Sequence, residues 1–141
     1  LLSPQNRIEL VNLALKDQSY LKVCDIELDM AVPSYTIATL TKLHEDFPSD
    51  EFSIIMGTEN LEKIDQWKDY EQILSQFRIF VYPRKKSNGG VFINHTNVQL
   101  ATSQLIEISS SEIREQIRRN QNDGLLPDLI WETILERKYY L

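Results

Sequence analysis

Two short and nearly continuous apolar runs constrain the fold of this chain more than any other feature. The first, Glu51–Gly57, ends at a glycine, and the second covers Ile79–Tyr82, with helical spacing of apolar residues between them. Strands that helices cover on both faces have this composition, because both sets of side chains are buried. Two such strands joined by a helical segment predict a parallel β-α-β unit.

The remaining segments continue the alternation of helices and strands. Ser3 followed by Pro4 is typical of a helix start, and apolar spacing predicts a helix to about Lys16. A second helix is predicted from a Ser34 cap to a stop at Pro48. Further helices are predicted over 61–67, 70–76 and 127–137, and further strands over 21–28, 91–93 and 98–100, while 105–108 lead into another helix start. The sequence therefore predicts one α/β domain over residues 1–141, with a doubly wound parallel sheet, helices on both faces and a ligand crevice beyond the carboxyl ends of the strands.

Charge and cysteine content exclude several classes of protein. The net charge of −6 and the pI near 4.9 argue against a nucleic-acid partner, which requires a basic face. One cysteine, Cys24, permits no internal disulfide and no cysteine-based metal cluster, so a cytoplasmic location is expected. No run approaches ~20 apolar residues, so no membrane partner is expected. Local basic clusters must then meet any anionic substrate, and the candidates are Arg84-Lys85-Lys86 and the trio Arg114, Arg118 and Arg119.

The segment I-S-S-S-E-I-R at 108–114 is typical of a loop that enters a helix. Ser109 is the predicted N-cap, and Glu112 completes a capping box. Ser110 and Ser111 then lie on the first turn, where free N–H groups and the helix dipole favour an anion by roughly 0.3–1 kcal/mol. Arg114, one turn further, would reach back to a phosphate held there. Most capping boxes only start a helix, so the spacing alone leaves both functions open.

Residues at three other places also suit either a structural role or ligand binding. Thr36 is predicted on the first turn of the second helix, where amides and its hydroxyl suit a carboxylate or a phosphate, although an ordinary cap is the simpler explanation. Gly57 lets a ligand approach the backbone, or is only a turn residue, and Glu59 would accept hydrogen bonds from ribose hydroxyls. Arg84 follows the second apolar run and suits a phosphate.

The tryptophans and histidines have simpler predicted roles. A tryptophan in an α/β protein is usually in the core, which applies to Trp67 from its position alone. Trp131 lies on the apolar face of the last predicted helix and is predicted to be core. His44 and His95 have no partner at metal or catalytic spacing, so both are predicted to be structural or exposed, and no protein metal site is expected.

Taken together, these segments resemble the bacterial nicotinate mononucleotide adenylyltransferases of the nucleotidyltransferase superfamily. I-S-S-S-E-I-R is similar to the I-S-[SA]-T-x-I-R signature, and P-S-Y-T-I-A-T-L at 33–40 is similar to the segment that holds the pyridine carboxylate. G-T-E-N at 57–60 resembles G-x-D-N, with a tryptophan at the family's spacing after it, and V-Y-P-R at 81–84 resembles V-x-x-R. L-P-D-L-I at 126–130 is similar to the V-P-D-x-V that opens the last helix, so the resemblance covers essentially the whole chain.

The resemblance implies a Rossmann-like fold and adenylyl transfer from ATP to nicotinate mononucleotide. The products would be pyrophosphate and nicotinate adenine dinucleotide, for NAD biosynthesis. Ser111 and Arg114 would be catalytic, and the implied ATP-binding residues are Ile108, Ser109, Ser110, Ser111, Arg114 and Gly57. The implied mononucleotide-binding residues are Tyr35, Thr36, Glu59, Trp67 and Arg84, with the indole stacked on the pyridine. Mg²⁺ would arrive with ATP.

The sequence departs from the family pattern in three respects. Ser111 replaces the usual threonine but keeps the hydroxyl, and Glu59 replaces the usual aspartate, which changes the geometry of the ribose contact. The family's first strand and its G-x-F-D-P-x-H-x-G-H motif do not occur, so the chain is expected to be N-terminally incomplete and to lack part of the active site on its own. Two alternatives stay open: a sibling such as pantetheine phosphate adenylyltransferase, and a catalytically dead nucleotide-binding module. A homo-oligomer is also left open.

Overall fold

Two compact units make up the chain, which the computed structural model describes over residues 2–102 and 108–140. The sheet unit covers Met30–Glu107, and the helical unit combines Leu1–Asp29 with Ile108–Leu141. Among the described residues, no helix is long and apolar enough to cross a membrane. The single domain over residues 1–141 stays a prediction.

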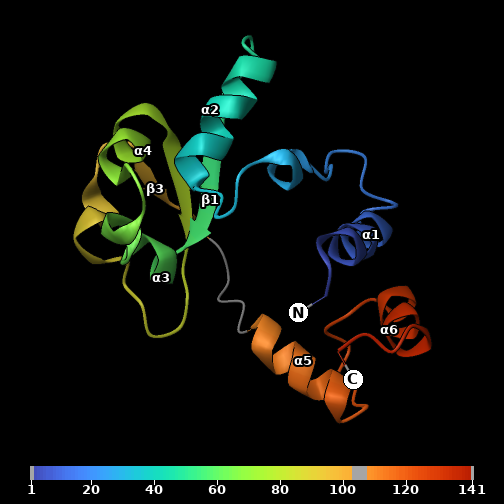
Figure 1. Cartoon of the computed structure of the whole chain (residues 1–141). Helices are drawn as coiled ribbons and strands as arrows, with labels where there is room; N and C mark the ends of the chain where they lie inside the picture. Colours follow the sequence, from blue (N-terminus) through green and yellow to red (C-terminus); the bar gives the residue numbers. More distant parts are fainter. Residues whose placement is uncertain (1, 103–107, 141) are drawn as a thin grey trace. The chain divides into compact units, whose positions relative to one another are not determined.

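A parallel sheet of three strands, in the order β1-β2-β3, forms the centre of the sheet unit (Figure 1). β1 (Ser53–Gly57) pairs with β2 (Arg78–Tyr82), and β2 pairs with β3 (Val98–Leu100). Both apolar runs and one further predicted strand are therefore confirmed, and so is the α/β class. Because Gly57 lies opposite Tyr82 in the register, β1 and β2 end at the same edge of the sheet.

Helices pack on this sheet and complete a hydrophobic core. They are α2 (Thr36–Asp46), α3 (Thr58–Leu61), α4 (Tyr70–Gln76) and the 3-10 helices η2 (Ile64–Gln66) and η3 (Gly90–Asn94). The buried core consists of Ile37, Met56, Leu61, Ile64, Ile73, Leu74, Ile79 and Val81. Asn97 Nδ2 donates to the carbonyls of Leu74 at 2.9 Å and Ser75 at 3.1 Å. This side chain satisfies carbonyls at the end of α4 that lack helical partners, and it fixes the start of β3 beside α4.

The helical unit consists of α1 (Pro4–Ala14), η1 (Ile26–Asp29), α5 (Ser110–Arg118) and α6 (Asp128–Glu136). Ser3 Oγ accepts from the N–H of Asn6 at 3.2 Å, with Pro4 as the first helical residue, which confirms the predicted start of α1. Ile117, Ile130 and Ile134 form the buried core of this unit. Trp131 packs against them, as predicted.

Three secondary-structure predictions are wrong. Residues 21–28 form no strand and end in η1, because a strand requires a hydrogen-bonded neighbour and no described strand pairs with them. Residues 91–93 lie in η3, which follows the positive φ of Gly89 (87°) and Gly90 (66°) and leaves Val91 87% exposed. The helix predicted over 61–67 is instead the pair α3 and η2. Of the predicted lead 105–108, residues 105–107 lie outside the described residues.

The burial of β1 also differs from the prediction. Met56 is buried, but Ile55 on the opposite face is 76% exposed, so that face of β1 is not covered at Ile55 by any described residue. An apolar run shows that a strand suits burial on both faces, whereas actual burial depends on which elements pack there.

Candidate functional site

The carboxyl ends of β1 and β2 are tied together by one buried threonine. Thr58, 2% exposed, follows Gly57 and begins α3, and its Oγ1 accepts from the backbone N–H of Arg84 at 3.0 Å. This bond joins the start of α3 to the loop that follows β2. It therefore positions both segments at the strand edge where a parallel α/β sheet binds ligands.

Glu59 and Arg84 meet over Gly57 at this edge. Arg84 Nε lies 3.4 Å from Glu59 Oε1, and Glu59 Oε2 is buried without a hydrogen-bond partner in the part of the chain that the structure describes. A Cβ added at Gly57 would lie 2.8 Å from Arg84 Cγ and closer still to Glu59 Oε2. The φ of Gly57 is an ordinary −82°, so glycine is required here by close packing and not by backbone conformation.

The start of α2 forms a second group of predicted site residues. Tyr35, rather than the predicted Ser34, is the N-cap, and it makes no side-chain capping bond, so the Ser34 prediction is wrong. Thr36 is the first helical residue. The amides of this first turn thus lack the side-chain acceptor that caps many helices. Lys68 Nζ lies 4.8 Å from the centroid of the Tyr35 ring, a cation–π contact that brings the segment after η2 beside α2.

Trp67, directly after η2, is partly buried and packs against the core of the sheet unit. Its backbone N–H donates to the carbonyl of Ile64 at 2.9 Å. The sequence offered a core role and a ligand role for this indole, and its packing accounts for the first. Partial exposure beside Lys68 leaves the second as a proposal.

The predicted capping box begins α5 in the helical unit. Ser109 Oγ accepts from the N–H of Glu112 at 3.2 Å, and Glu112 Oε2 accepts from the N–H of Ser109 at 3.0 Å. Ser110 and Ser111 are the first two helical residues. The polar N-terminal turn is thus fixed by reciprocal bonds, as the sequence predicted.

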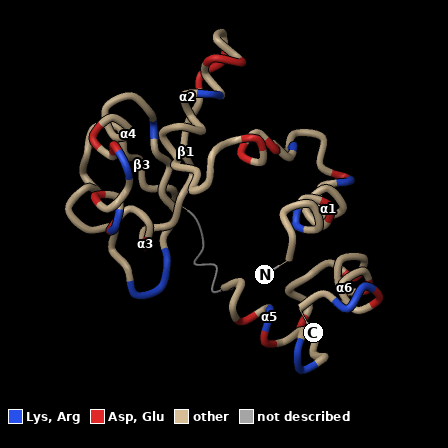
Figure 2. The backbone as a smooth tube through the Cα atoms, in the orientation of Figure 1, with Lys and Arg blue, Asp and Glu red and all other residues tan. Residues whose placement is uncertain are grey.

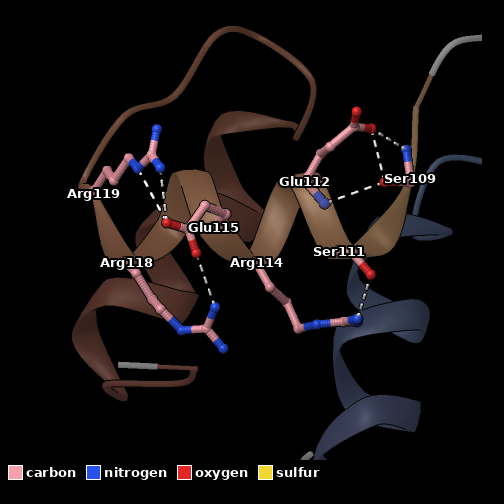
Figure 3. Close-up of polar contacts among 7 residues, drawn as sticks. All are labelled: Ser109, Ser111, Glu112, Arg114, Glu115, Arg118 and Arg119. Carbon is pink, nitrogen blue, oxygen red and sulfur yellow. Dashed lines mark hydrogen bonds and ion pairs between the residues drawn. The ribbon is translucent and has the colours of Figure 1, made fainter.

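The three arginines of α5 and its end differ in their partners (Figure 3). Arg118 and Arg119 both pair with Glu115, at 3.1 Å and 3.0 Å. The hydrogen bond from Arg118, followed by the charge of Arg119, lowers the pKa of the Glu115 carboxyl below its ordinary value. Arg114 Nη2 instead donates to Ser111 Oγ at 3.2 Å, so its guanidinium points back toward the N-terminus of α5. Of the predicted basic trio, Arg114 is the member directed at the first turn.

The other basic cluster, Arg84-Lys85-Lys86, forms a continuous basic stretch of the loop after β2 (Figure 2). Arg84 and Ser87 form an antiparallel bridge, and Lys86 has a positive φ of 70°. The chain therefore turns tightly directly after Arg84.

The predicted site residues form three groups, two in the sheet unit and one in the helical unit. Gly57, Glu59 and Arg84 meet, and Tyr35 with Thr36 lies beside the segment of Trp67. Ile108 to Arg114 belong to the helical unit. Sequence reasoning missed Thr58 and Lys68; the signal for Thr58 was its place directly after a strand-ending glycine. His44 is exposed, and His95 Nδ1 accepts from the N–H of Asn97 at 3.3 Å, so neither prediction needs correction.

Ser109→Ala is expected to destabilise the protein by about 1 kcal/mol, because one side chain supplies the cap of α5. Denaturant unfolding measures this, and Ser110→Ala is the matched control, since Ser110 lies next to the cap without serving it. The control is expected to stay within about 0.5 kcal/mol of the wild type. Equal stabilities for the two variants would mean that the capping box does not hold α5.

The sequence is similar to known proteins over nearly its whole length. A family model described as cytidylyltransferase-like matches residues 1–116. A probable nicotinate-nucleotide adenylyltransferase from Flavobacterium psychrophilum is 43% identical over 143 residues, which cover 99% of this chain and 74% of that protein. A protein with the same description from Cytophaga hutchinsonii is 36% identical, with 99% and 73% covered.

Solved structures have the same fold. A putative nicotinate-nucleotide adenylyltransferase from Vibrio parahaemolyticus aligns with a TM-score of 0.73 at 20% identity, covering 99% of this chain and 72% of that one. The nicotinic acid mononucleotide adenylyltransferase of Plasmodium falciparum, complexed with NaAD, aligns with a TM-score of 0.79 at 16% identity, covering 99% and 75%. At these identities the likeness concerns the fold alone.

Proposed function

Because this chain belongs to the cytidylyltransferase-like family, and within it to the nicotinate-nucleotide adenylyltransferases, we propose that it transfers the adenylyl group of ATP to nicotinate mononucleotide. A phosphate oxygen of the mononucleotide bonds to the α-phosphorus of ATP while the bond from that phosphorus to pyrophosphate breaks. The products are nicotinate adenine dinucleotide and pyrophosphate, in NAD biosynthesis. The reaction needs no covalent bond to the protein, so positioning and charge stabilisation supply the catalysis.

The observation that supports this function most directly is the direction of Arg114. Its guanidinium is held by a neutral hydroxyl, that of Ser111, at 3.2 Å and lies toward the first turn of a capped helix. Because this contact is with an uncharged group, the positive charge of Arg114 is available to a phosphate. The charges of Arg118 and Arg119 are instead compensated by Glu115. We assign Ser111 and Arg114 to the transferring phosphates of ATP, with the backbone from Ile108 through Ser110 beside them.

The sheet unit would bind the nucleosides and the mononucleotide. Glu59 Oε2 is a buried acceptor that no described residue hydrogen-bonds, which suits a ribose hydroxyl, and Arg84 suits the mononucleotide phosphate. At the start of α2, the uncapped amides and the hydroxyl of Thr36 suit the pyridine carboxylate. Tyr35 and Trp67 would line that end of the site.

Magnesium is proposed to enter as the complex with ATP. Among the described residues, no group of three or more His, Cys, Asp or Glu side chains could hold a metal ion. Mg²⁺ usually binds through substrate phosphates and waters with only one or two carboxylates, so an ion that arrives with ATP needs no larger group of protein ligands.

Thr36→Val is expected to weaken nicotinate mononucleotide by about ten-fold and ATP much less, because it removes a hydroxyl next to the proposed carboxylate while keeping the side-chain volume. Steady-state kinetics with each substrate varied in turn measures the two effects. The matched control is Thr41→Val on the same helix, whose hydroxyl donates to the carbonyl of Ile37 at 2.9 Å. Equal losses for both substrates, or for both variants, would remove Thr36 from the carboxylate pocket.

A further inference from the structure

Arg84 is held at two points from the start of α3. Its backbone N–H donates to Thr58 Oγ1 at 3.0 Å, and its Nε lies 3.4 Å from Glu59 Oε1. The first contact fixes the backbone of Arg84, and the second is one of the contacts that orient its side chain. The side chain of Arg84 is 25% exposed and that of Glu59 is 41% exposed, so this ion pair is only partly shielded from water.

The second oxygen of the same carboxylate has no hydrogen-bond partner among residues 2–102 and 108–140. Glu59 Oε2 is buried against Gly57, where even a Cβ would collide with it. A buried carboxylate oxygen without a hydrogen bond is costly, and native structures contain few of them. A donor from a ligand would remove that cost, and a sugar hydroxyl is the donor that the proposed substrates bring.

We propose that Glu59 is a positioning residue that couples recognition of a ribose hydroxyl, at Oε2, to the orientation of the Arg84 guanidinium toward a phosphate, at Oε1. The inference rests on the proposed function, which supplies both the hydroxyl and the phosphate. A hydroxyl bound to Oε2 fixes the carboxylate plane, and that plane fixes the direction in which Oε1 holds Nε of Arg84. One side chain thereby aligns two parts of the bound nucleotides.

The length of the side chain is part of the inference. Aspartate would withdraw the carboxylate by about 1.5 Å, one carbon–carbon bond, and so separate Oε1 from an Nε that already lies 3.4 Å away. The glutamate at this place is thus what allows both contacts. Aspartate would keep the charge and an acceptor for the hydroxyl but lose the contact with Arg84.

A double-mutant cycle tests the coupling through binding of nicotinate mononucleotide, measured by titration calorimetry on the protein from its complete reading frame. Glu59→Asp and Arg84→Ala are each expected to weaken binding about ten-fold, while the double variant is expected to be no weaker than Arg84→Ala alone. Glu59→Gln keeps the side-chain length and an oxygen for Nε of Arg84, so it is expected to bind nicotinate mononucleotide more tightly than Glu59→Asp does. Unfolding midpoints of all variants separate these effects from folding.

Deoxy analogues identify the hydroxyl. The 2′-deoxy and 3′-deoxy forms of ATP and of the mononucleotide are titrated into the wild type and into Glu59→Gln. One of these four analogues is expected to bind the wild type about ten-fold more weakly than its parent nucleotide does, and the difference is expected to be smaller in Glu59→Gln. The missing hydroxyl of that analogue is then the one that Glu59 binds.

The two proposals can fail separately. Losses that add in the double variant, or equal deoxy penalties in wild type and Glu59→Gln, would overturn the coupling whatever the turnover. An intact cycle without formation of nicotinate adenine dinucleotide would overturn the proposed function and leave the coupling standing.

Discussion

Gly57→Ala is expected to lower kcat/KM by about 100-fold, because the new methyl group would occupy the place of the Glu59 carboxylate. The added Cβ would lie 2.8 Å from both Glu59 Cδ and Arg84 Cγ, so both side chains must move. Displacing site groups by about 1 Å can cost 100-fold in rate, and overpacking costs about 1–3 kcal/mol of stability. Steady-state kinetics and denaturant unfolding measure the two effects.

Gly124→Ala is the matched control for this substitution. Gly124 has a positive φ of 75°, but nothing lies within 4 Å of an added Cβ. This variant is expected to lose stability through backbone strain and to keep its activity once folded. If Gly57→Ala also kept its kcat/KM, Glu59 and Arg84 would not belong to the site.

Arg114→Ala is expected to lower kcat/KM for ATP by about 10- to 100-fold. The loss corresponds to one charge-assisted donor to the ATP phosphates, worth roughly 1.5–3 kcal/mol. Arg118→Ala on the same helix is the matched control, because its guanidinium is bound to Glu115 at 3.1 Å. That control is expected to leave ATP kinetics within about two-fold of wild type. Similar kinetics for both variants would remove Arg114 from the phosphate site.

Local patterns in the sequence predicted those parts of the fold that depend on neighbouring residues. The capping box of Ser109 and Glu112 formed because its bonds span only three positions. The apolar runs at β1 and β2 formed strands because they pair with each other. Residues 21–28 have a strand composition but no described strand beside them, and residues 91–93 follow two glycines that turn the chain. Strand pairing depends on tertiary structure, and the positive φ of the two glycines is a backbone conformation; residue composition specifies neither of them.

The site shows the same division. Motif spacing identified Gly57, Glu59 and Arg84 one by one, but the sequence did not reveal that Glu59 folds over Gly57 to reach Arg84. That contact depends on side-chain length and on the parallel register of two strands. Thr58 and Lys68 were missed because a threonine after a strand and a lysine after a tryptophan are common in any sequence. Their roles follow from a bond across 26 positions and from a cation placed over a ring.

Adenylyl transfer to nicotinate mononucleotide can be tested by direct analysis of the products. The protein from its complete reading frame is incubated with Mg·ATP and either nicotinate mononucleotide or pantetheine phosphate, and products are identified by mass spectrometry with pyrophosphate measured in parallel. We expect nicotinate adenine dinucleotide and pyrophosphate in equal amounts, with nicotinate mononucleotide as the strongly preferred acceptor. Preferred transfer to pantetheine phosphate, or binding of both nucleotides with no transfer between them, would contradict it.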